Sequence, residues 1–197
     1  MVCMESPKQA GQTNFMGTLN VLEASRTSQA KRVVYSSTSS AYGLRNDPPL
    51  KEDMPRDCLN PYSVTKVAAE DLVKMYYTLW GLEGIIFRYF NVYGERQPTR
   101  GQYAPVIGLF QRQKAAGESM TVVGDGEQRR DYTHVSDVVG ANMAAAFTDN
   151  KKALGEVINV GTGTNHSVNQ LTELIGGERE YIPERPGEAR ETLADIT

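Results

Sequence analysis

The chain has 197 residues, of which 40% are hydrophobic and 23% are charged, a balance typical of a globular protein with a buried core. Its net charge of −3 argues against a general polyanion binder, and no apolar run approaches the roughly 18 residues of a membrane-spanning helix. The two cysteines, Cys3 and Cys58, form neither a disulfide framework nor a metal-ligand spacing. We therefore expect a soluble cytoplasmic protein, and no metal site is predicted.

Helices and short apolar strands alternate along the chain. Phe15, Leu19 and Leu22 share one face of the first predicted helix, and the long helix after Pro61 has a similar apolar side. In chain order we predict a helix at 12–25, a strand at 33–36, a loop at 47–59, a helix at 61–79, a strand at 84–91, a helix at 104–116, a strand at 120–123, a helix at 135–147, a strand at 157–159 and a helix at 167–175. This order predicts an α/β fold with a parallel sheet.

The segment at 60–66, Asn-Pro-Tyr-Ser-Val-Thr-Lys, combines a helix start with two groups suited to proton transfer. Asn60 can cap a helix that Pro61 opens, so Tyr62 and Lys66 should lie one turn apart on one face. A phenol with a pKa of about 10 is a poor base at neutral pH, but an ammonium within about 6 Å lowers that pKa. The spacing alone is also compatible with an exposed helical pair that has no catalytic role.

Hydroxyl side chains follow the predicted strand at 33–35. The run from Ser36 to Ser40 lies at the carboxyl end of that strand, which is where open α/β sheets bind their ligands. We therefore expect these hydroxyls to face a cleft.

These segments together resemble a known family. A strand followed by SSTSSAYG (36–43), then PYSVTK (61–66) and RYFNVYG (88–94), is similar to the extended short-chain dehydrogenase/reductases, the NAD-dependent epimerases and dehydratases that act on nucleotide sugars. Further matches follow in order: GDG (124–126), RRDY (129–132), VSDV (135–138), NVGTG (159–163), RPGE (185–188) and ADI (194–196). The resemblance extends over nearly the whole chain and is strongest to UDP-glucose and UDP-N-acetylglucosamine 4-epimerases.

The resemblance implies roles for individual residues. Thr38, Tyr62 and Lys66 match the catalytic hydroxyl donor, the proton acceptor, and the lysine that tunes the tyrosine and holds the nicotinamide ribose. The residues implied in NAD binding are Asn14, Ser36, Ser37, Tyr62, Lys66, Tyr89 and Phe90. Those implied in UDP-sugar binding are Thr38, Ser40, Asn91, Tyr103, Ala104, Arg130, Arg185, Glu188 and Thr192, with the two arginines on the diphosphate.

Some of these residues also have a structural interpretation. Thr38 could cap a helix at the end of its strand, and Tyr89 and Phe90 could be core aromatics. Arg130 and Arg185 could be solvated surface side chains.

The two histidines and the segment at 122–126 are expected to have structural rather than catalytic roles. His134 and His166 lie at the starts of predicted helices, where local hydrogen bonds are expected of them. The segment at 122–126 is interpreted as a hairpin-like Asp-Gly turn, because it lacks the Lys-Ser/Thr that follows in a phosphate-binding loop.

The residues after Thr38 favour epimerisation over the other reactions of the resembled family. Its dehydratases carry an acidic pair directly after the threonine, and its decarboxylases carry a glutamate two positions before the tyrosine of the Tyr-Gly pair, whereas this chain has Ser39 and Ser40 there. Neutral hydroxyls suit reversible oxidation at one carbinol, so the resemblance implies a 4-epimerase in which Tyr62 takes the C4 hydroxyl proton. Thr192 stands where relatives restricted to plain hexoses carry a tyrosine, which predicts a pocket that admits N-acetylhexosamines.

Compared with the family pattern, the chain lacks the N-terminal strand, glycine-rich turn and helix that hold the NAD pyrophosphate, and it stops before a last helix. We expect residues 1–95 to form the C-terminal half of a Rossmann-type NAD-binding domain. Residues 96–197 should form mostly a small substrate-binding part, with segments that return to the Rossmann sheet. The helices at 12–25 and 61–79 match the pair that forms a dimer in relatives, so a homodimer is expected.

This incompleteness leaves a second function open. Because the pyrophosphate and adenosine of NAD lack their expected site, NAD binding by this chain is in doubt. The alternative to an enzyme is a non-catalytic module for nucleotide-sugar binding or dimerisation, or one half of a split enzyme.

Overall fold

The structure is a computed structural model that describes residues 2–99, 105–184 and 189–197. The chain divides into two compact units. The first unit comprises Met1–Asp47, Lys51–Tyr89 and Val139–Val160, and the second comprises Pro48–Leu50, Phe90–Val138 and Gly161–Thr197. One helix, α6 (Val135–Phe147), begins in the second unit and continues in the first.

A parallel sheet forms the centre of the first unit. Within the described residues its strands run in the order β1 (Arg32–Thr38), β2 (Glu83–Tyr89) and β7 (Val157–Val160). β1 pairs with β2 over its full length and ends with Thr38 opposite Tyr89. Because parallel strands end at the same edge of a sheet, the predicted hydroxyl cluster and the end of β2 are neighbours. The predicted α/β fold with a parallel sheet is confirmed.

Helices cover both faces of this sheet. Side chains of Tyr35, Ser37 and Arg88 bond to α4 (Pro61–Trp80) on one face. Tyr89 bonds to Asn142 of α6, and since neighbouring residues of a strand point to opposite faces, α6 covers the other face. Burial on both faces explains why β2 is apolar along most of its length.

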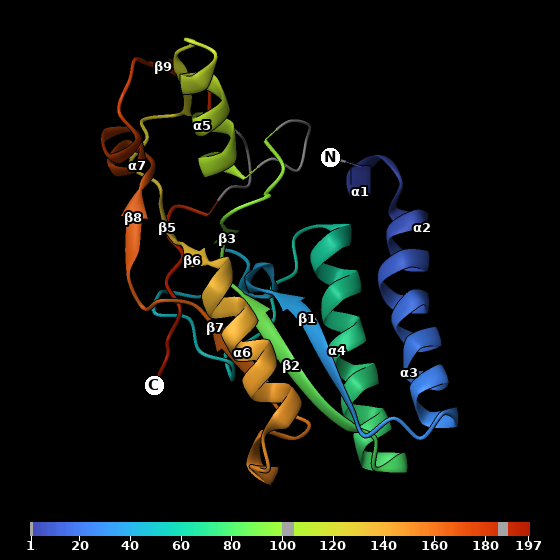
Figure 1. The fold of residues 1–197 in the computed structure, drawn as a ribbon. Helices are drawn as coiled ribbons and strands as arrows, with labels where there is room; N and C mark the ends of the chain where they lie inside the picture. The colour runs from blue at the N-terminus through green and yellow to red at the C-terminus, as the bar shows by residue number, and fades with distance from the viewer. Residues whose placement is uncertain (1, 100–104, 185–188) are drawn as a thin grey trace. The chain divides into compact units, whose positions relative to one another are not determined.

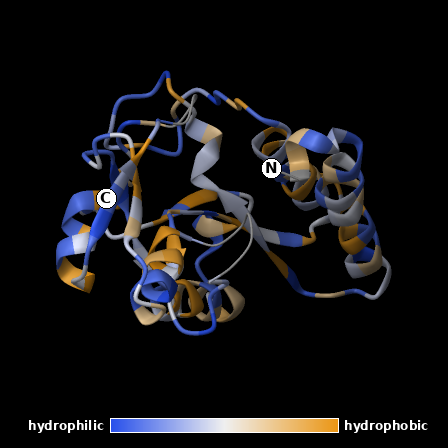
Figure 2. Ribbon diagram, turned by 90° about the horizontal axis from the view of Figure 1, so that it is seen from above, coloured by the Kyte–Doolittle hydropathy of each residue, from blue (hydrophilic) through white to orange (hydrophobic). Residues whose placement is uncertain are grey.

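The predicted helix at 12–25 is part of a longer helical stretch. It consists of α1 (Val2–Glu5), α2 (Pro7–Ala10), the π-helical η1 (Gly11–Met16) and α3 (Gly17–Thr27). α3 packs on the outer side of α4 (Figure 1). Between α3, α4 and the sheet lies a core of Leu22, Tyr35, Ala69, Val73, Tyr76, Leu82 and Ile86. Hydrophobic and hydrophilic residues are mixed along the N-terminal helices (Figure 2).

Within its described residues, the second unit contains short strands, two complete helices and the start of α6. Its elements are β3 (Val92–Tyr93), α5 (Val106–Ala115), β4 (Met120–Val123), β5 (Arg129–Asp131), β6 (Thr133–His134), β8 (Asn165–Ser167), α7 (Val168–Ile175) and β9 (Arg179–Ile182). β4 pairs with β9 and β3 with β6, both in parallel, and β5 pairs antiparallel with β8. Phe110, Met120, Val122 and Val168 form one apolar cluster between α5, β4 and α7.

The turn at Asp125 and Gly126 is present, but the predicted hairpin is wrong. Gly126 has a φ of +74°, and the Asp125 carboxylate accepts a hydrogen bond from the Glu127 amide at 2.9 Å. The strands on either side of the turn, β4 and β5, pair with β9 and β8 instead of with each other. Both partners come from far along the chain, and local turn chemistry cannot reveal them.

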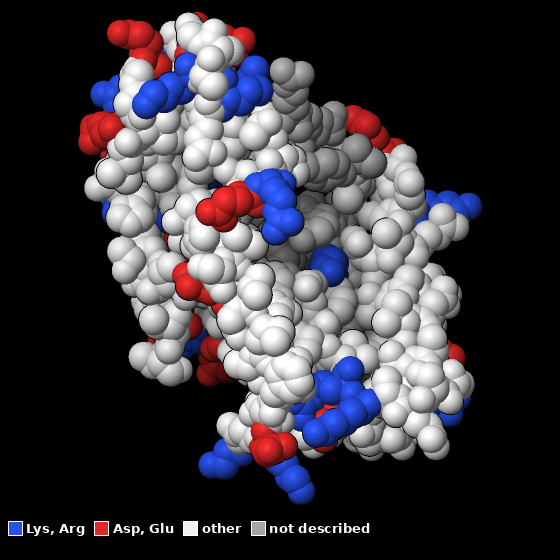
Figure 3. All heavy atoms as spheres, viewed as in Figure 1, with Lys and Arg blue, Asp and Glu red and all other residues white. Residues whose placement is uncertain are grey.

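Two 3₁₀ helices, η2 (Ser39–Tyr42) and η3 (Lys151–Ala153), complete the described elements. No helix in the described part of the chain is long and apolar enough to cross a bilayer. On the face shown in Figure 3, lysine and arginine side chains are interspersed with acidic and uncharged residues.

Candidate functional site

Thr38 lies at the carboxyl end of β1, where the chain turns into η2. Its hydroxyl oxygen accepts a hydrogen bond from the Ser40 amide at 3.1 Å and so caps η2, as the structural interpretation expected. The same side chain lies near the Tyr62 hydroxyl and lowers the pKa of that phenol. Capping and contact with the candidate base are therefore two functions of one buried threonine.

Gly43 ends the η2 segment, and its position in the Tyr-Gly pair has a backbone cause. It has a φ of +60°, and a Cβ there would lie 2.0 Å from the Asp57 carbonyl oxygen. Only glycine fits this turn.

The start of α4 positions Tyr62 and Lys66 as predicted. Asn60 caps the helix, because its side-chain oxygen accepts from the Ser63 amide at 2.9 Å while Ser63 Oγ accepts from the Asn60 amide. Pro61 occupies the first helical position. Tyr62 therefore lies in the first turn, with 39% of its surface exposed, and Lys66 follows one turn later.

The protonation of this pair differs from the expectation. Loss of hydration raises the pKa of Tyr62 above its usual value, while the nearby Thr38 hydroxyl lowers it and the neighbouring Cys3 raises it. Lys66 is not among the groups that shift the Tyr62 pKa, and its ammonium lies 4.3 Å from the centre of the Tyr35 ring. Burial lowers the pKa of Lys66 itself, and Glu70 partly offsets this. The predicted lowering of the Tyr62 pKa by Lys66 is thus absent from this arrangement.

The two serines implied in cofactor binding point in different directions. Ser36 is exposed, and its hydroxyl donates to the Tyr89 hydroxyl at 3.5 Å. Ser37 is buried and donates to a carboxylate oxygen of Glu70. Alternation along β1 causes this difference, so only Ser36 presents its hydroxyl at the surface.

The remaining candidates, Asn14 and Ser40 in the first unit and Phe90 in the second, have mixed outcomes. Asn14 donates from its side-chain nitrogen to the Thr65 hydroxyl on α4 at 3.0 Å, so it supports the helix that carries Lys66. Ser40 is exposed in η2. Phe90, the first residue after β2, is fully enclosed, which agrees with a core aromatic and leaves its ring no surface for a ligand.

A cavity of ≈ 410 Å³ lies within the second unit. It is lined by Asn91, Val92, Tyr93, Pro105, Val106, Ile107, Leu109, Phe110, Thr121, Val123, Gln128, Arg130, Tyr132 and Val168. The lining is mainly apolar, with a few polar groups and one arginine, a composition typical of small-molecule sites. Two of the predicted substrate residues, Asn91 and Arg130, belong to it.

Asn91 has an unusual backbone conformation, with a φ of +27°. Its side-chain nitrogen donates to the Asp131 carbonyl at 2.8 Å and to the Thr192 hydroxyl at 3.4 Å. The structure thus brings Asn91 and Thr192, two predicted substrate residues, into direct contact. Residues that hold such conformations cluster at functional sites.

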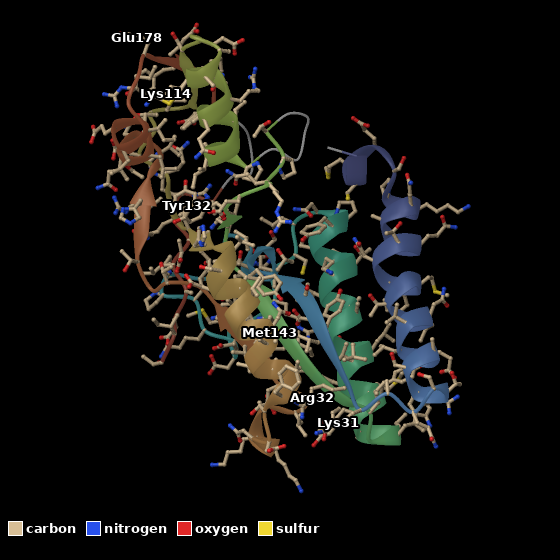
Figure 4. The ribbon with its side chains drawn as sticks, in the orientation of Figure 1. Lys31, Arg32, Lys114, Tyr132, Met143 and Glu178 are labelled. Atoms are coloured by element: carbon tan, nitrogen blue, oxygen red, sulfur yellow. The ribbon has the colours of Figure 1, made fainter. Side chains whose placement is uncertain are left out.

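Tyr132 lines the same cavity and was missed by the sequence reasoning. It directly follows β5 (Figure 4), only 9% of its surface is exposed, and its hydroxyl has no hydrogen-bond partner among the described residues. Burial raises its pKa to about 12, so the hydroxyl is protonated at neutral pH. The sequence did contain a signal for Tyr132. It is two residues from the predicted site residue Arg130, so the two side chains share one face of an extended chain.

The opposite face of the same strand anchors the surrounding loops. Arg129 bonds to the side-chain and backbone oxygens of Asn165 at 2.7 and 2.8 Å. The buried Asp131 carboxylate accepts hydrogen bonds from the amides of Thr162, Gly163 and Ala194 and from the Thr162 hydroxyl. One face of β5 thus lines the cavity while the other fixes the strand.

Four predicted site residues, Tyr103, Ala104, Arg185 and Glu188, lie outside the described residues. Among the described residues, no group of three or more His, Cys, Asp or Glu side chains is placed to hold a metal ion.

Comparisons with known proteins agree on one family. Residues 1–161 match the model of the NAD dependent epimerase/dehydratase family. The chain is 38% identical over 200 residues to a putative UDP-glucose 4-epimerase of Methanocaldococcus jannaschii, covering 98% of this chain and 64% of that protein.

Two solved structures are similar over nearly the whole chain. They are the UDP-N-acetylglucosamine 4-epimerase of Methanobrevibacter ruminantium M1 in complex with UDP-N-acetylmuramic acid (TM-score 0.94, 34% identity) and the UDP-glucose 4-epimerase of Thermotoga maritima with UDP-glucose (TM-score 0.92, 35% identity). The alignments cover 99% and 100% of this chain and 64% of each relative. The chain therefore spans about 64% of the length of the relatives it matches, and it belongs to the NAD-dependent epimerase/dehydratase family.

Proposed function

We propose that this chain carries the catalytic and nucleotide-binding residues of an NAD-dependent UDP-sugar 4-epimerase. The observation that carries the proposal is that Thr38 at the end of β1 lies near the Tyr62 hydroxyl and lowers its pKa, with Lys66 one turn further along α4. Uncharged Ser39 and Ser40 follow Thr38, so no acid or base for elimination stands there. The similar 4-epimerases support the same reaction.

Each residue of the first unit has a defined task in this reaction. Tyr62 accepts the proton of the sugar C4 hydroxyl while C4 is oxidised to a ketone, and returns it to the oxygen when C4 is reduced from its other side. Thr38 orients the Tyr62 hydroxyl. Proton acceptance requires the phenolate, so the raised pKa of Tyr62 must fall, and Lys66 is the cation on the same helix face that can lower it.

The residues present fit the nicotinamide end of NAD. Ser36, Tyr62, Tyr89 and Lys66 offer hydroxyl and ammonium groups of the kind that bind a ribose and an amide. Bound NAD supplies the hydride acceptor and donor.

The cavity of the second unit suits the nucleotide of the substrate. Its apolar walls fit a planar base, and Thr121 and Gln128 can bond the polar edge of that base. The Arg130 guanidinium suits a diphosphate, and the Tyr132 hydroxyl can donate to it. Thr192, in contact with Asn91, is smaller by a ring than the tyrosine of relatives restricted to plain hexoses, so we propose UDP-N-acetylhexosamines as well as UDP-hexoses as substrates.

The proposal divides the work between the two units. The first unit carries the cofactor end and the chemistry, and the second carries the nucleotide. We also propose a homodimer through the helices at 12–25 and 61–79, supported by exposed apolar side chains on both.

The test is the interconversion of the two 4-epimers of UDP-N-acetylhexosamine and of UDP-hexose by the purified protein with added NAD. Tyr62→Phe should lower the rate at least about 100-fold, the low end of general acid/base contributions, and leave UDP-sugar binding within a few-fold. Tyr77→Phe, on the same helix, is the matched control and should retain the rate. Retained activity in Tyr62→Phe contradicts the assignment.

A second candidate is a nucleotide-sugar-binding module without catalysis. The favouring observation is that the cavity lies entirely within the second unit. Release of NAD from the denatured purified protein, or NAD binding in solution, supports the enzyme. UDP-sugar binding without NAD binding and without turnover supports the module instead.

A further inference from the structure

One buried ionic cluster of the first unit is not used by the proposed mechanism. Arg88 of β2 binds Glu70 of α4 through two hydrogen bonds, from Nε to Oε1 at 3.0 Å and from Nη2 to Oε2 at 2.8 Å. Both side chains are buried, Glu70 completely. Ser37 of β1 adds a third bond to Glu70 Oε1, and Arg56 lies 3.7 Å from Oε2. A buried carboxylate is thus held by three separate segments of the chain.

The cluster lies next to the candidate catalytic residues in sequence and in space. Glu70 follows Lys66 by four residues on α4, which puts the two on one face one turn apart. Ser37 directly precedes Thr38. Fixing Glu70 against β1 and β2 therefore fixes the helix that carries Tyr62 and Lys66 against the strand that carries Thr38.

The cation side of the cluster is equally constrained. The Arg88 guanidinium lies 4.8 Å from the centre of the Tyr42 ring, and its Nη1 donates to the Glu52 carbonyl at 3.4 Å. Tyr42 in turn donates to the Asn159 side chain of β7 at 2.6 Å. Arg88 cannot follow Glu70 if that side chain moves, so the contact acts as a fixed point for α4.

We propose that Glu70 is a positioning residue for the Tyr62 and Lys66 pair: its carboxylate, held by Arg88 and Ser37, fixes the first turns of α4 and presents a negative charge to Lys66 from inside the protein. The proposal rests on the catalytic role proposed above, but its test does not need turnover. Buried ion pairs are weak contributors to stability, and positioning gives this one a separate purpose.

The groups that face Lys66 make the charge relation specific. Tyr35 of β1 presents its ring, and its own pKa is raised to about 12, so it is neutral at physiological pH. Tyr62 precedes Lys66 on α4, and Glu70 follows it. Burial lowers the pKa of Lys66 and Glu70 raises it. Among these groups Glu70 supplies the negative charge, and Arg88 and the more distant Arg56 are the cations that pair with it.

Two variants should shift the Lys66 pKa in opposite directions. Glu70→Gln keeps the shape of the side chain but removes its charge, so the pKa of Lys66 should fall by roughly one unit. Arg88→Met removes the nearer of the two cations beside the carboxylate and leaves only the more distant Arg56, so the pKa of Lys66 should rise. General loosening of the fold would expose Lys66 to water in both variants and shift its pKa in the same direction in both.

The measurement is an NMR pH titration of ¹³C-labelled lysine side chains, with the Lys66 signal assigned through Lys66→Arg. The matched control is Glu83→Gln, which removes the partner of Arg32 at the other end of the same strands and should leave the Lys66 pKa within about 0.2 units. Opposite shifts in Glu70→Gln and Arg88→Met support the proposal. Shifts in the same direction, or an unchanged pKa in folded Glu70→Gln, overturn it.

A milder variant covers the case in which Arg88→Met does not fold. Ser37→Ala removes one donor to Glu70 and leaves both charges in place, so its shift of the Lys66 pKa must be smaller than that of Glu70→Gln. An equal or larger shift contradicts the charge relation. These outcomes do not depend on whether the protein epimerises UDP-sugars, so failure of the proposed function and failure of this inference remain distinguishable.

Discussion

A buried hydroxyl without a hydrogen-bond partner costs free energy, and Tyr132 has one in the wall of the cavity, where no described residue bonds to it. Tyr132→Phe removes that cost, so the free energy of unfolding should stay equal or rise by up to about 1 kcal/mol. If the hydroxyl serves a ligand, the same change should weaken UDP-sugar binding roughly 5- to 10-fold. Urea unfolding and titration calorimetry measure the two effects.

Tyr35→Phe is the matched control for this prediction. The Tyr35 hydroxyl donates to the Lys66 carbonyl at 3.1 Å, so its loss should destabilise the protein by about 1 kcal/mol. A destabilised Tyr132→Phe with unchanged ligand binding would show that the Tyr132 hydroxyl has a structural partner instead.

Thr192 tests substrate choice at the level of one side chain. It contacts Asn91 through its hydroxyl, and its backbone is bonded to Arg129 and Asp131 on both sides, so it cannot withdraw. Thr192→Tyr should therefore weaken binding of UDP-N-acetylhexosamines at least about 10-fold and of UDP-hexoses much less. Thr192→Ser, which keeps the hydroxyl and the small volume, should retain both. Equal losses for both sugar classes in Thr192→Tyr contradict the predicted gatekeeper.

The sequence predicted the position of a site residue only where neighbouring residues in the chain determine that position. The Tyr62 and Lys66 geometry follows from the Asn60 cap and Pro61, all within one turn. The separation of Ser36 from Ser37 follows from strand alternation, which the prediction of a common role overlooked. The position of the Lys66 ammonium over the Tyr35 ring depends on packing between α4 and β1, which no local pattern encodes.

At the scale of the element, β5 depends on the Asp131 carboxylate, which accepts four hydrogen bonds from two distant loops. The packing is close: a Cβ at Gly161 would lie 2.8 Å from Asp131 Oδ2. Asp131→Asn replaces one acceptor oxygen by a donor that faces other donors, so the free energy of unfolding should fall by roughly 2–4 kcal/mol. Chemical denaturation measures it.

Asp149→Asn, at an exposed position after α6, serves as the control and should change stability by less than about 0.5 kcal/mol. If Asp131→Asn is as mild as this control, the carboxylate does not fix β5.

Elements with strong local signals were predicted closely, and those held by distant partners were missed. The predicted helix at 61–79 is Pro61–Trp80, because a capping box starts it and Gly81 ends it with a φ of +68°. β9 and β8 have four and three residues and exist only through their pairing with β4 and β5. Both are mostly polar, so they lack the apolar run that predicted the equally short β4.

At the scale of the whole molecule, two buried tyrosines should lower the free energy of unfolding at alkaline pH. The pKa values of Tyr35 and Tyr132 are raised to about 12, whereas in the unfolded chain they are about 10. Below pH 10 both states keep the proton, and above it the unfolded chain loses its proton first, so stability falls as the pH rises from 10 towards 12. Over this range each tyrosine lowers the free energy of unfolding by up to about 1.4 kcal/mol for every pH unit. Denaturation midpoints across this range should fall less steeply in Tyr132→Phe than in the parent protein, and an equal slope in the two would contradict the prediction.

The association state is the prediction that involves the whole molecule. Val64, Met75 and Leu79 are spaced to share one face of α4, and all three are exposed, as is Val21 on α3. Burial of these apolar faces against a second copy of the chain would remove them from water and so stabilise a dimer.

Light scattering at tens of micromolar protein should therefore give twice the monomer mass, and Leu79→Asp should give the monomer, because a buried charge without a partner is costly at an interface. Phe147→Asp is the control: this side chain is 75% exposed but lies at the end of α6, outside the proposed interface, and the variant should remain dimeric. A monomeric parent protein would contradict the proposed dimer. A dimer that Phe147→Asp dissociates and Leu79→Asp does not would place the interface elsewhere.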